Sequence, residues 1–542
     1  MKQKREPHEI WAEYQKGSGY NSSINLYETV QQCEDFYVGD QWKGCEGIDL
    51  DKPVMNILKR VVSFFIASIV SDDIGIHMET FDGAEQHKPV LDMLDGELGS
   101  ILENARMRQH FRTFLRNAAV DGDGCLHYWF DPEAETGRPA GGDIEPTGGA
   151  IKAEILENYN VFFGNPQSKE VQGQPYIIVR YRRLLGEAKE IAKANGAAEW
   201  DSIQADAGEE GVNTDQEQGK VTVLRKYWKE NGTVHFTEVC KQCVLRPEAD
   251  TGYKLYPLVW MPWEAVKNQY HGQSAIKCMI PNQIFINKLY AMAMRHVQMC
   301  AFPKVVYNRA MLPGGWTNRV GEAIPSNGDP NMAVGQGIRL PDMSAQVLQM
   351  ISQVTQDTRD TMGASDASLG NIKPDNTSAI IATQKATAMP LELQRMSFYD
   401  IVEESVRIWL EMMRCNYGLR YVMLEQPAQA VPGIDAFKLG GPMAEPAKEP
   451  VLYDFGQLGE LQLQLNVEIG AASYWSEIMQ VQTIDGLFAN GILSDPEVYL
   501  ESIPDGYIKN KAQIIKSVKD RKEQETRAAQ MAAMAKAGGM PI

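Results

Sequence analysis

The chain has 542 residues, enough for roughly three or four domain-sized units or for one large α/β assembly with insertions. Hydrophobic residues at 44% and charged residues at 23% are ordinary for a globular protein, which excludes disordered and repeat-scaffold classes. The 71 acidic residues outnumber the 53 basic ones, and the formal charge of −18 argues against a protein that coats nucleic acid or an anionic membrane. This charge is still compatible with a protein through which DNA passes.

The sequence contains neither the apolar core of a secretory signal nor an apolar run long enough to span a membrane. No apolar core follows the basic start, so we expect no secretory signal. The longest apolar run, residues 61–70, has about half of the roughly 20 residues that span a bilayer, and we expect no transmembrane span. Eight cysteines are a low density for a disulfide scaffold, so most are expected to be reduced core residues.

The first half of the chain mixes expected helices and strands. Apolar residues at spacings of three and four predict an amphipathic helix over 53–69. A second helix is expected over 101–117, with Arg106, Arg108, Arg112 and Arg116 on its outer face. The Asp121–Gly124 turn ends this helix, and residues 132–149 are expected to form a hairpin tip. Strands are expected at 125–131, 151–156, 176–181, 221–227, 234–239 and 258–261, with a mobile acidic insertion at 195–220.

The second half begins with a helical pattern that runs from Gln273 to about Cys300, in which Pro281 is either a kink or an early-turn residue. A compact Pro/Gly-rich unit is expected from Phe302 to Pro341. A helix at 344–362, a polar loop at 363–376 and a long helix at 377–415, bent near Met389 because of Pro390, follow it. After a Pro/Gly-rich connection at 426–456, we expect a strand at 461–469, then helices at 475–490, 495–503 and 508–536 and a frayed tail.

Motifs that carry chemistry are absent from the sequence or incomplete in it. No P-loop, HExxH or Gly-x-Ser-x-Gly pattern occurs, so no enzyme and no cofactor are predicted. The run Asp121–Gly124 superficially resembles a calcium loop but lacks the later ligands, and a helix-to-strand turn is the preferred interpretation. Cys240 and Cys243 could supply two thiolates to zinc, but a structural site needs four ligands, so two cysteines in a hairpin are expected instead.

The order of elements is more informative than any motif. Two long helices flank the small unit at 302–341, so they are expected to form a hairpin that holds this unit away from the rest of the chain. The helices are too sparsely apolar to form a self-sufficient core. We therefore expect subunits to pack side by side around a ring.

Several short stretches, taken in order, resemble the portal proteins of tailed bacteriophages. The most telling one runs from Tyr270 to Lys288 and is similar to the family's G-x-S-x-x-x-x-x-x-P-x-Q-x-x-x-N helix entry. The others are Gly122–Gly124 followed by a strand, Asn376–Gln384, and Asp35–Trp42 with Asn56 in the helix after it. The resemblance covers essentially the whole chain, although none of these stretches is a catalytic signature.

The resemblance implies an α+β, portal-like subunit with named regions. The wing would be residues 1–270, with an α/β character, and the two stem helices would be 271–301 and 342–362. Between the stem helices, 302–341 would be a small β-containing clip. The remaining regions would be a tunnel loop at 363–376, a long bent wing helix at 377–418, wing return strands and linker at 419–472, and a helical crown and tail at 473–542.

In function, the family implies a ring of twelve subunits at one capsid vertex of the virion. Double-stranded DNA would enter through the ring during packaging and leave through it during ejection. Expected partners are the chain itself, the terminase large subunit as packaging motor, a head-completion or tail adaptor, and the major capsid and scaffolding proteins. No membrane partner is expected, and assembly would take place in the host cytoplasm.

Sparse cations could give a mild grip on DNA inside an otherwise neutral or acidic channel, because a strongly basic channel would bind DNA and stall its movement. The candidates are Lys288, Arg295, Arg359, Lys373 and Lys385, and we expect Lys373 and Arg359 to lie nearest the tunnel. Each of the five could equally be a solvated charge or part of an ion pair between subunits. The resemblance places docking of motor and adaptor in the clip, where Trp316, Asn318 and Arg319 are the candidate residues. A basic helix near the carboxyl end either faces packaged DNA or is simply solvated.

Two other functions compete with the portal interpretation. A DNA-packaging enzyme, either an ATPase or a nuclease, would show hydrolysis or cleavage by the isolated chain, although the missing motifs argue against it. A non-portal capsid or tail adaptor would also assemble into a ring, but that ring would lie elsewhere than at the packaging vertex.

Overall fold

A computed structural model describes the fold of most of the chain. The described residues are 6–44, 51–70, 74–80, 88–134, 148–206, 219–301, 304–315, 324–338, 345–364, 389–425, 448–460, 463–469, 481, 483–488, 496–503, 514–515 and 517–518. The chain separates into two compact units: the first comprises Met1–Ile69 and Ile76–Asn466, and the second comprises Val70–Gly75 and Val467–Ile542. The fold is a mixture of helices and antiparallel sheets, so the expected α+β class is confirmed.

A five-stranded antiparallel sheet lies in the first unit, with its strands in sequential order β4-β5-β6-β7-β8. Side chains of β6 alternate between the two faces, as the pleat of a strand requires. Val221 and Val223 pack with Ala188 of α6 on one face, whereas Leu224 packs with Ile10 and other residues of α1 on the opposite face. The bounds are β4 (Val161–Phe163), β5 (Tyr176–Leu184), β6 (Lys220–Glu230), β7 (Thr233–Val239), β8 (Val244–Asp250), α1 (Pro7–Ser23) and α6 (Leu185–Ala194).

A three-stranded sheet joins the middle of the chain to a long late helix. Its strand order is β3-β2-β9, with β3 (Ala150–Ile155), β2 (Asp123–Asp131) and β9 (Leu258–Pro262). Helix α11 (Glu392–Asn416) contacts β2 and β9. The Tyr128 hydroxyl donates to the Ser405 Oγ at 2.8 Å, and the rings of Tyr128 and Trp409 meet edge to face with centroids 5.7 Å apart. These buried groups fix α11 on the sheet.

One helix of the first half of the chain, α5 (Met107–Asp121), packs on this sheet, and three others pack on α5: α2 (Leu26–Val38), α3 (Ile57–Ile69) and α4 (Lys88–Asn104). Helix α5 contacts each of the other three as well as β2. The apolar stripe that predicted α3 is buried along its length, at Leu58, Val61, Val62, Phe65 and Ile69. The predicted amphipathic helix is confirmed, but it begins at Ile57 and not at Pro53, because residues 53–56 are not helical.

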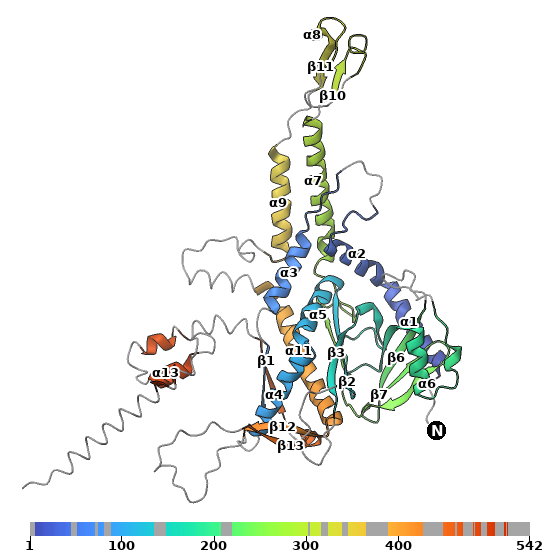
Figure 1. Ribbon diagram of the computed structural model, residues 1–542, viewed down its shortest axis with the longest axis vertical. Coiled ribbons are helices and arrows are strands. Elements are labelled where there is room, and N and C mark those ends of the chain that lie inside the picture. Colours follow the sequence, from blue (N-terminus) through green and yellow to red (C-terminus); the bar gives the residue numbers. More distant parts are fainter. Residues whose placement is uncertain are drawn as a thin grey trace, which may run out of the picture. The chain divides into compact units, whose positions relative to one another are not determined.

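Helices α7 (Ile280–Ala301) and α9 (Ala345–Thr361) lie side by side (Figure 1) and contact each other. The segment between them contains β10 (Lys304–Tyr307), α8 (Pro330–Ala333) and β11 (Val334–Ile338), and β10 pairs with β11 in antiparallel fashion. At 1.5 Å per residue, α7 is about 33 Å long. The expected helical hairpin with a small inserted unit is therefore present.

The remaining described elements are two short sheets, several 3-10 turns and one helix. Strand β12 (Leu419–Glu425) pairs with β13 (Lys448–Asp454), and β1 (Ile74–Thr80) pairs with β14 (Leu463–Ile469). The 3-10 turns are η2 (Asn158–Asn160), η3 (Trp200–Ser202), η4 (Lys277–Met279), η5 (Met389–Leu391) and η7 (Phe455–Glu460). The second unit contains α13 (Pro496–Ser502), and residues 483–488 are also helical.

Several expected boundaries were wrong. Instead of one helix over 101–117, α4 and α5 meet at Arg106, whose φ of 50° is left-handed and interrupts the helix. Arg116 is only partly exposed, because it pairs with Glu34. The helix expected from Gln273 begins at Ile280, after a 3-10 turn, so Pro281 is an early-turn residue rather than a kink.

Pro390 lies in η5, directly before α11, which begins at Glu392. Residues 377–388, the first part of the expected long helix, lie outside the described residues, so the bend expected near Met389 stays a prediction. Strand β13 falls inside the stretch that was expected to be a Pro/Gly-rich connection.

The acidic insertion at 195–220 is packed where it is described. Ile203 is buried, and Asp206 pairs with Arg182 and accepts a hydrogen bond from the Thr222 amide. Residues 207–218, most of the hairpin tip at 132–149 and most of the helix at 508–536 lie outside the described residues.

Candidate functional site at the base of the helical hairpin

Four buried or half-buried amide side chains connect the base of α7 with the amino-terminal part of the chain. We call Gln41, Asn56, Gln283 and Asn287 the amide cluster. Gln283 and Asn287 are four residues apart on α7, so they share one helix face, and their exposed fractions are 0% and 2%. A buried amide is costly unless it is hydrogen-bonded, so the partners of these groups decide what they do.

Gln283 and Asn287 bind the extended segment that precedes α3. The Gln283 Nε2 donates to the Met55 carbonyl at 2.7 Å, and its Oε1 accepts from the Ile57 amide at 3.2 Å. The Asn287 Oδ1 accepts from the Met55 amide at 3.2 Å, while its Nδ2 donates to the Gln41 Oε1 at 2.6 Å. This pattern ties the first turns of α7 to backbone more than two hundred residues earlier.

The other two members of the cluster hold the end of α2. Gln41 Nε2 donates to the Phe36 carbonyl at 2.9 Å, and Asn56 Nδ2 donates to the Tyr37 carbonyl at 3.0 Å. Asn56 Oδ1 accepts from the Lys59 amide at 3.0 Å, which caps the first turn of α3. All four amides belong to the stretches that carry the family resemblance, and their shared role is structural.

A second junction lies where the Asp121–Gly124 turn meets residues 270–275. The Asp123 carboxylate lies 2.7 Å from His271 Nδ1 and accepts from the Gly272 amide at 2.7 Å. Ser274 Oγ donates to the Ala119 carbonyl at 3.0 Å. The turn is thus a helix-to-strand connection, the interpretation preferred from the sequence, and it is hydrogen-bonded to the segment that leads into α7.

Glycines make this second junction possible. Gly122 has φ +102°, a left-handed conformation that side chains disfavour, and a Cβ there would lie 2.8 Å from the Gly272 carbonyl oxygen. A Cβ on Gly272 would in turn lie 2.7 Å from the Gly122 oxygen and 2.7 Å from the Cβ of Pro262. The two backbones therefore approach too closely for any side chain.

Buried carboxyl groups surround this turn. Burial raises the pKa of Asp121 to about 8, and it also raises the pKa of Glu157 above its usual range. The nearby Arg116 guanidinium, paired with Glu34, opposes the shift at Asp121. Asp121 is thus a carboxyl group that is costly to ionise in the folded chain.

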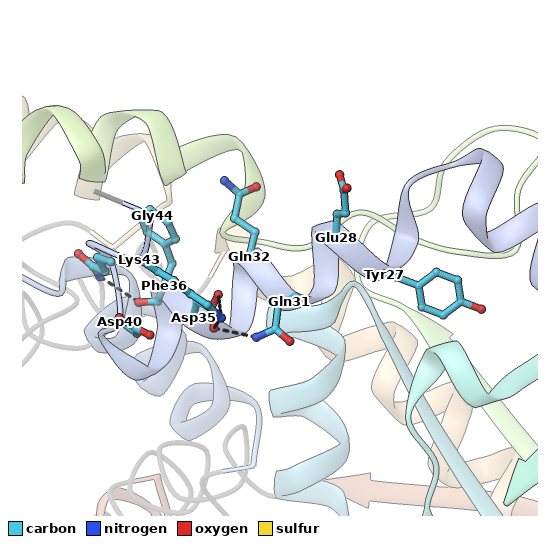
Figure 2. A pocket seen from close by; sticks show the side chains of 10 residues that line it. Tyr27, Glu28, Gln31, Gln32, Asp35, Phe36, Asp40, Lys43 and Gly44 are labelled. Carbon is cyan, nitrogen blue, oxygen red and sulfur yellow. Dashed lines mark hydrogen bonds and ion pairs between the residues drawn. The ribbon is translucent and has the colours of Figure 1, made fainter. Parts of the chain in front are cut away.

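A cavity of about 540 Å³ runs along α2 (Figure 2). Asp35 lies at its centre, where it accepts from Gln31 Nε2 at 2.7 Å and pairs with Lys43 Nζ at 2.9 Å. Gln41 of the amide cluster lines the cavity, and so does Phe36, whose carbonyl accepts a hydrogen bond from Gln41. The full lining is Tyr27, Glu28, Gln31, Gln32, Asp35, Phe36, Asp40, Gln41, Lys43 and Gly44.

Helix α7 carries exposed apolar side chains above its anchored base. Phe285, Met292 and Met299 follow one stripe at spacings of seven and are 39%, 56% and 40% exposed. Met294 and Val297 continue the face that is buried at the base, yet they are 42% and 57% exposed. One chain alone therefore leaves two apolar faces of α7 uncovered.

Helix α9 presents a polar stripe opposite the side on which Ile351 and Thr358 are buried. Exposed residues at spacings of three and four form this glutamine stripe, namely Gln346, Gln349, Gln353, Gln356 and Asp360. At about 100° per residue, the exposed Leu348 and Met350 lie on either side of the stripe. The 3.6-residue spacing of the glutamines was visible in the sequence, but its meaning required the buried face to be known.

The structure describes three of the five predicted channel cations. Lys288 is exposed and Arg295 is half-buried, and both lie on the α7 stripe that carries Met292. Arg359 is half-buried in the last turn of α9. Lys373, Lys385 and the predicted docking residues Trp316, Asn318 and Arg319 lie outside the described residues.

The two cysteines at 240 and 243 lie in the turn between β7 and β8, as expected. Their sulfur atoms are 3.6 Å apart, and both side chains are buried. Burial raises the pKa of the Cys243 thiol to about 12, which disfavours the thiolate that zinc binds. The structure thus agrees with the hairpin interpretation.

Taken together, the fold and these junctions define a structural subunit whose helical hairpin is fixed at its base by buried polar groups. Residues 176–419 match the model of the phage P22-like portal protein family, a segment that runs from β5 to the start of β12. This match confirms the expected resemblance to phage portal proteins. Members of this family are structural components of the virion. Membership would imply that the chain associates with itself and lies at a capsid vertex.

No match was found among curated proteins. In the part of the chain that the structure describes, no helix has both the length and the apolar character needed to cross a bilayer.

Proposed function

We propose that the chain assembles into a ring, with twelve subunits as the expected number, that conducts double-stranded DNA into a capsid and later out of it. In this proposal residues 1–270 form the wing, α7 and α9 belong to the stem, the β10–β11 unit belongs to the clip, and the residues after 473 form the crown. The family match supports the portal role, and the surface of the helical hairpin supports the ring.

The uncovered apolar faces of α7 are the observation that carries the proposal. Burial of a methionine or valine side chain contributes about 1.5–3 kcal/mol, so Met292 on one face of α7, and Met294 and Val297 on the other, favour contact with other apolar surfaces. A neighbouring copy of the hairpin offers such a surface, since Leu348 and Met350 are exposed on α9. Repetition of one α7-to-α9 contact closes a ring.

The glutamine stripe is suited to the wall of a DNA channel. The four glutamines of the stripe carry no charge and its fifth member, Asp360, is acidic, so the stripe does not release counterions from DNA and binds its phosphates only weakly. The stripe lies between Leu348 and Met350, so neighbours that cover both apolar residues would leave it facing the central space. DNA could then slide along it.

This arrangement distinguishes between the predicted channel cations. Lys288 and Arg295 share a stripe with Met292, so a subunit contact that covers Met292 places them at or near the interface. Arg359 lies about 100° around α9 from the centre of the glutamine stripe, on the side of Leu348. We propose that these three act between subunits and that Lys373 and Lys385 are the better candidates to meet DNA.

Docking belongs to the inserted unit in this proposal. The terminase large subunit would bind there during packaging, and the tail adaptor would replace it afterwards. Trp316, Asn318 and Arg319 are the proposed contact residues, and the basic stretch near the carboxyl end is a further candidate to face packaged DNA.

Electron microscopy and native mass spectrometry of the purified full-length chain test the ring directly. We expect rings with a central hole, and we expect Met292→Asp to shift the protein to single subunits because it places a charge in the contact. Gln353→Asp, which adds the same charge on the glutamine stripe, should leave the rings intact. A compact monomer at high concentration would contradict the proposal, and ATP hydrolysis or DNA cleavage by the isolated chain would favour a packaging enzyme.

A further inference from the structure

Three buried histidines of the first unit differ in how their ring nitrogens are satisfied. In His127 and His271, both ring nitrogens lie 2.7–3.1 Å from a hydrogen-bonding partner. His235 is equally buried, with 4% exposed, yet its Nδ1 makes no hydrogen bond. A buried nitrogen without a hydrogen bond is uncommon and calls for an explanation.

Carboxylates surround the His235 ring. The Nδ1 lies 3.3 Å from Glu248 Oε1, in a geometry that is not a hydrogen bond, and the Nε2 lies 3.9 Å from Asp250 Oδ2. One ligand atom each from Glu230, His235 and Glu248 falls within 4.8 Å of the other two. An imidazole nitrogen and two carboxylate oxygens therefore converge on one point.

The register of the sheet creates this convergence. His235 of β7 lies opposite Trp228 of β6 on one side and opposite Asp250 of β8 on the other. Glu230 and Glu248 are each two residues from these partners, so their side chains project from the same face of the sheet. The site thus lies on one sheet face and spans the last three strands.

We propose that Glu230, His235 and Glu248 bind a divalent transition-metal ion of the zinc class. Imidazole combined with carboxylates suits zinc and its neighbours, whereas calcium and magnesium favour oxygen ligands alone. Tetrahedral zinc with bonds of about 2.0–2.1 Å separates its ligand atoms by about 3.4 Å. His235 Nδ1 and Glu248 Oε1 already lie 3.3 Å apart, so it is mainly the Glu230 carboxylate that must move inward. Glu248 is exposed and Glu230 is half-buried, so both side chains have room to move.

The ion would stabilise the edge of the five-stranded sheet. Strand β8 is the outermost strand, and most of its side chains beyond Leu245 are exposed or only half-buried. A metal that binds residues of β6, β7 and β8 together would hold this strand in place and stabilise the folded state. The inference does not depend on the ring or on DNA conduction.

The experiment uses the full-length protein after treatment with a chelator. One competing site is removed first: His296 and Cys300 on α7 lie 3.3 Å apart and could bind zinc by themselves, so all variants carry Cys300→Ser. Zn²⁺ titration by calorimetry and metal analysis should show one bound ion per chain. His235→Gln and Glu248→Gln should each weaken binding at least about tenfold.

A matched control separates this site from surface histidines. His8 lies 3.3 Å from Glu6, but both side chains are exposed, so His8→Gln should leave Zn²⁺ affinity unchanged. Glu248→Gln should melt at the same temperature as the parent protein in chelator, and only the parent should be stabilised when Zn²⁺ is added. Absence of Zn²⁺ binding in the Cys300→Ser protein, or equal affinity in the His235→Gln protein, would overturn the proposal.

Discussion

Substitution of Asn287 by alanine tests whether the amide cluster anchors the helical hairpin. Asn287 is 2% exposed, and its side chain makes three hydrogen bonds, to Gln41, Met55 and Gln283. Each buried hydrogen bond contributes about 1 kcal/mol net, and its removal leaves a buried polar group of the partner without a hydrogen bond. We therefore expect Asn287→Ala to lower the local free energy of opening by about 3 kcal/mol.

Hydrogen exchange detected by mass spectrometry measures this effect where it should occur. A change of about 3 kcal/mol corresponds to roughly hundredfold faster exchange of the Met55 and Ile57 amides. Asn282→Ala is the matched control, because Asn282 is exposed and makes only a 3.4 Å contact with Thr358 and a weak contact with a methionine sulfur. If the two variants exchange at similar rates at Met55, the cluster does not hold the base of α7 and the reasoning is refuted.

The remaining predictions concern packing, pH and the channel. Gly272→Ala should destabilise the protein by about 2 kcal/mol or more, because the added Cβ would overlap the backbone of Gly122. Gly99→Ala, in open space within α4, should leave the melting temperature unchanged or raise it. Equal melting temperatures of the two variants in calorimetry would contradict the close approach of Gly272 to Gly122. Burial raises the pKa of Asp121 to about 8. The folded chain therefore has the full stability that protonated Asp121 allows below pH ~4, and it loses this stability as the pH rises towards 8. Asp121→Asn should therefore gain stability over the parent across that window and hold a constant gain above it, as denaturant titrations at several pH values would show; a gain that shrinks with pH would be inconsistent with this assignment. Gln349→Lys and Gln353→Lys should slow DNA passage in a packaging assay, while Gln353→Glu should not, and unchanged rates in the lysine variants would argue that the stripe faces away from DNA.

Local patterns were sufficient for much of the fold. The stripe at 53–69 predicted α3, because apolar residues at spacings of three and four must share a face and be buried. The alternation and turn signals predicted β2, β3, β5, β6, β7 and β9 within a few residues. The order of a helix, a Pro/Gly-rich unit and a second helix predicted the α7–α9 hairpin.

Boundaries failed where a proline or a single backbone torsion decided them. Pro281 lies in the first turn of α7, where a missing amide hydrogen costs nothing, and the pattern of apolar residues alone could not show this. The break at Arg106 depends on one left-handed residue that packing around α4 and α5 sustains. Helices α1 and α2 and strand β8 were not predicted at all.

The sequence by itself determined where many of the helices and strands form, and it carried the motifs that resemble portal proteins. Only the tertiary structure decided why those motifs exist. Gln41 and Asn287 are 246 positions apart, and no local periodicity indicates that their side chains meet at 2.6 Å. A hydrogen bond depends on distance in space, whereas a sequence pattern reports only the face on which a residue lies. For the same reason, His235 was one scattered histidine until the register of β6, β7 and β8 placed two glutamates beside it.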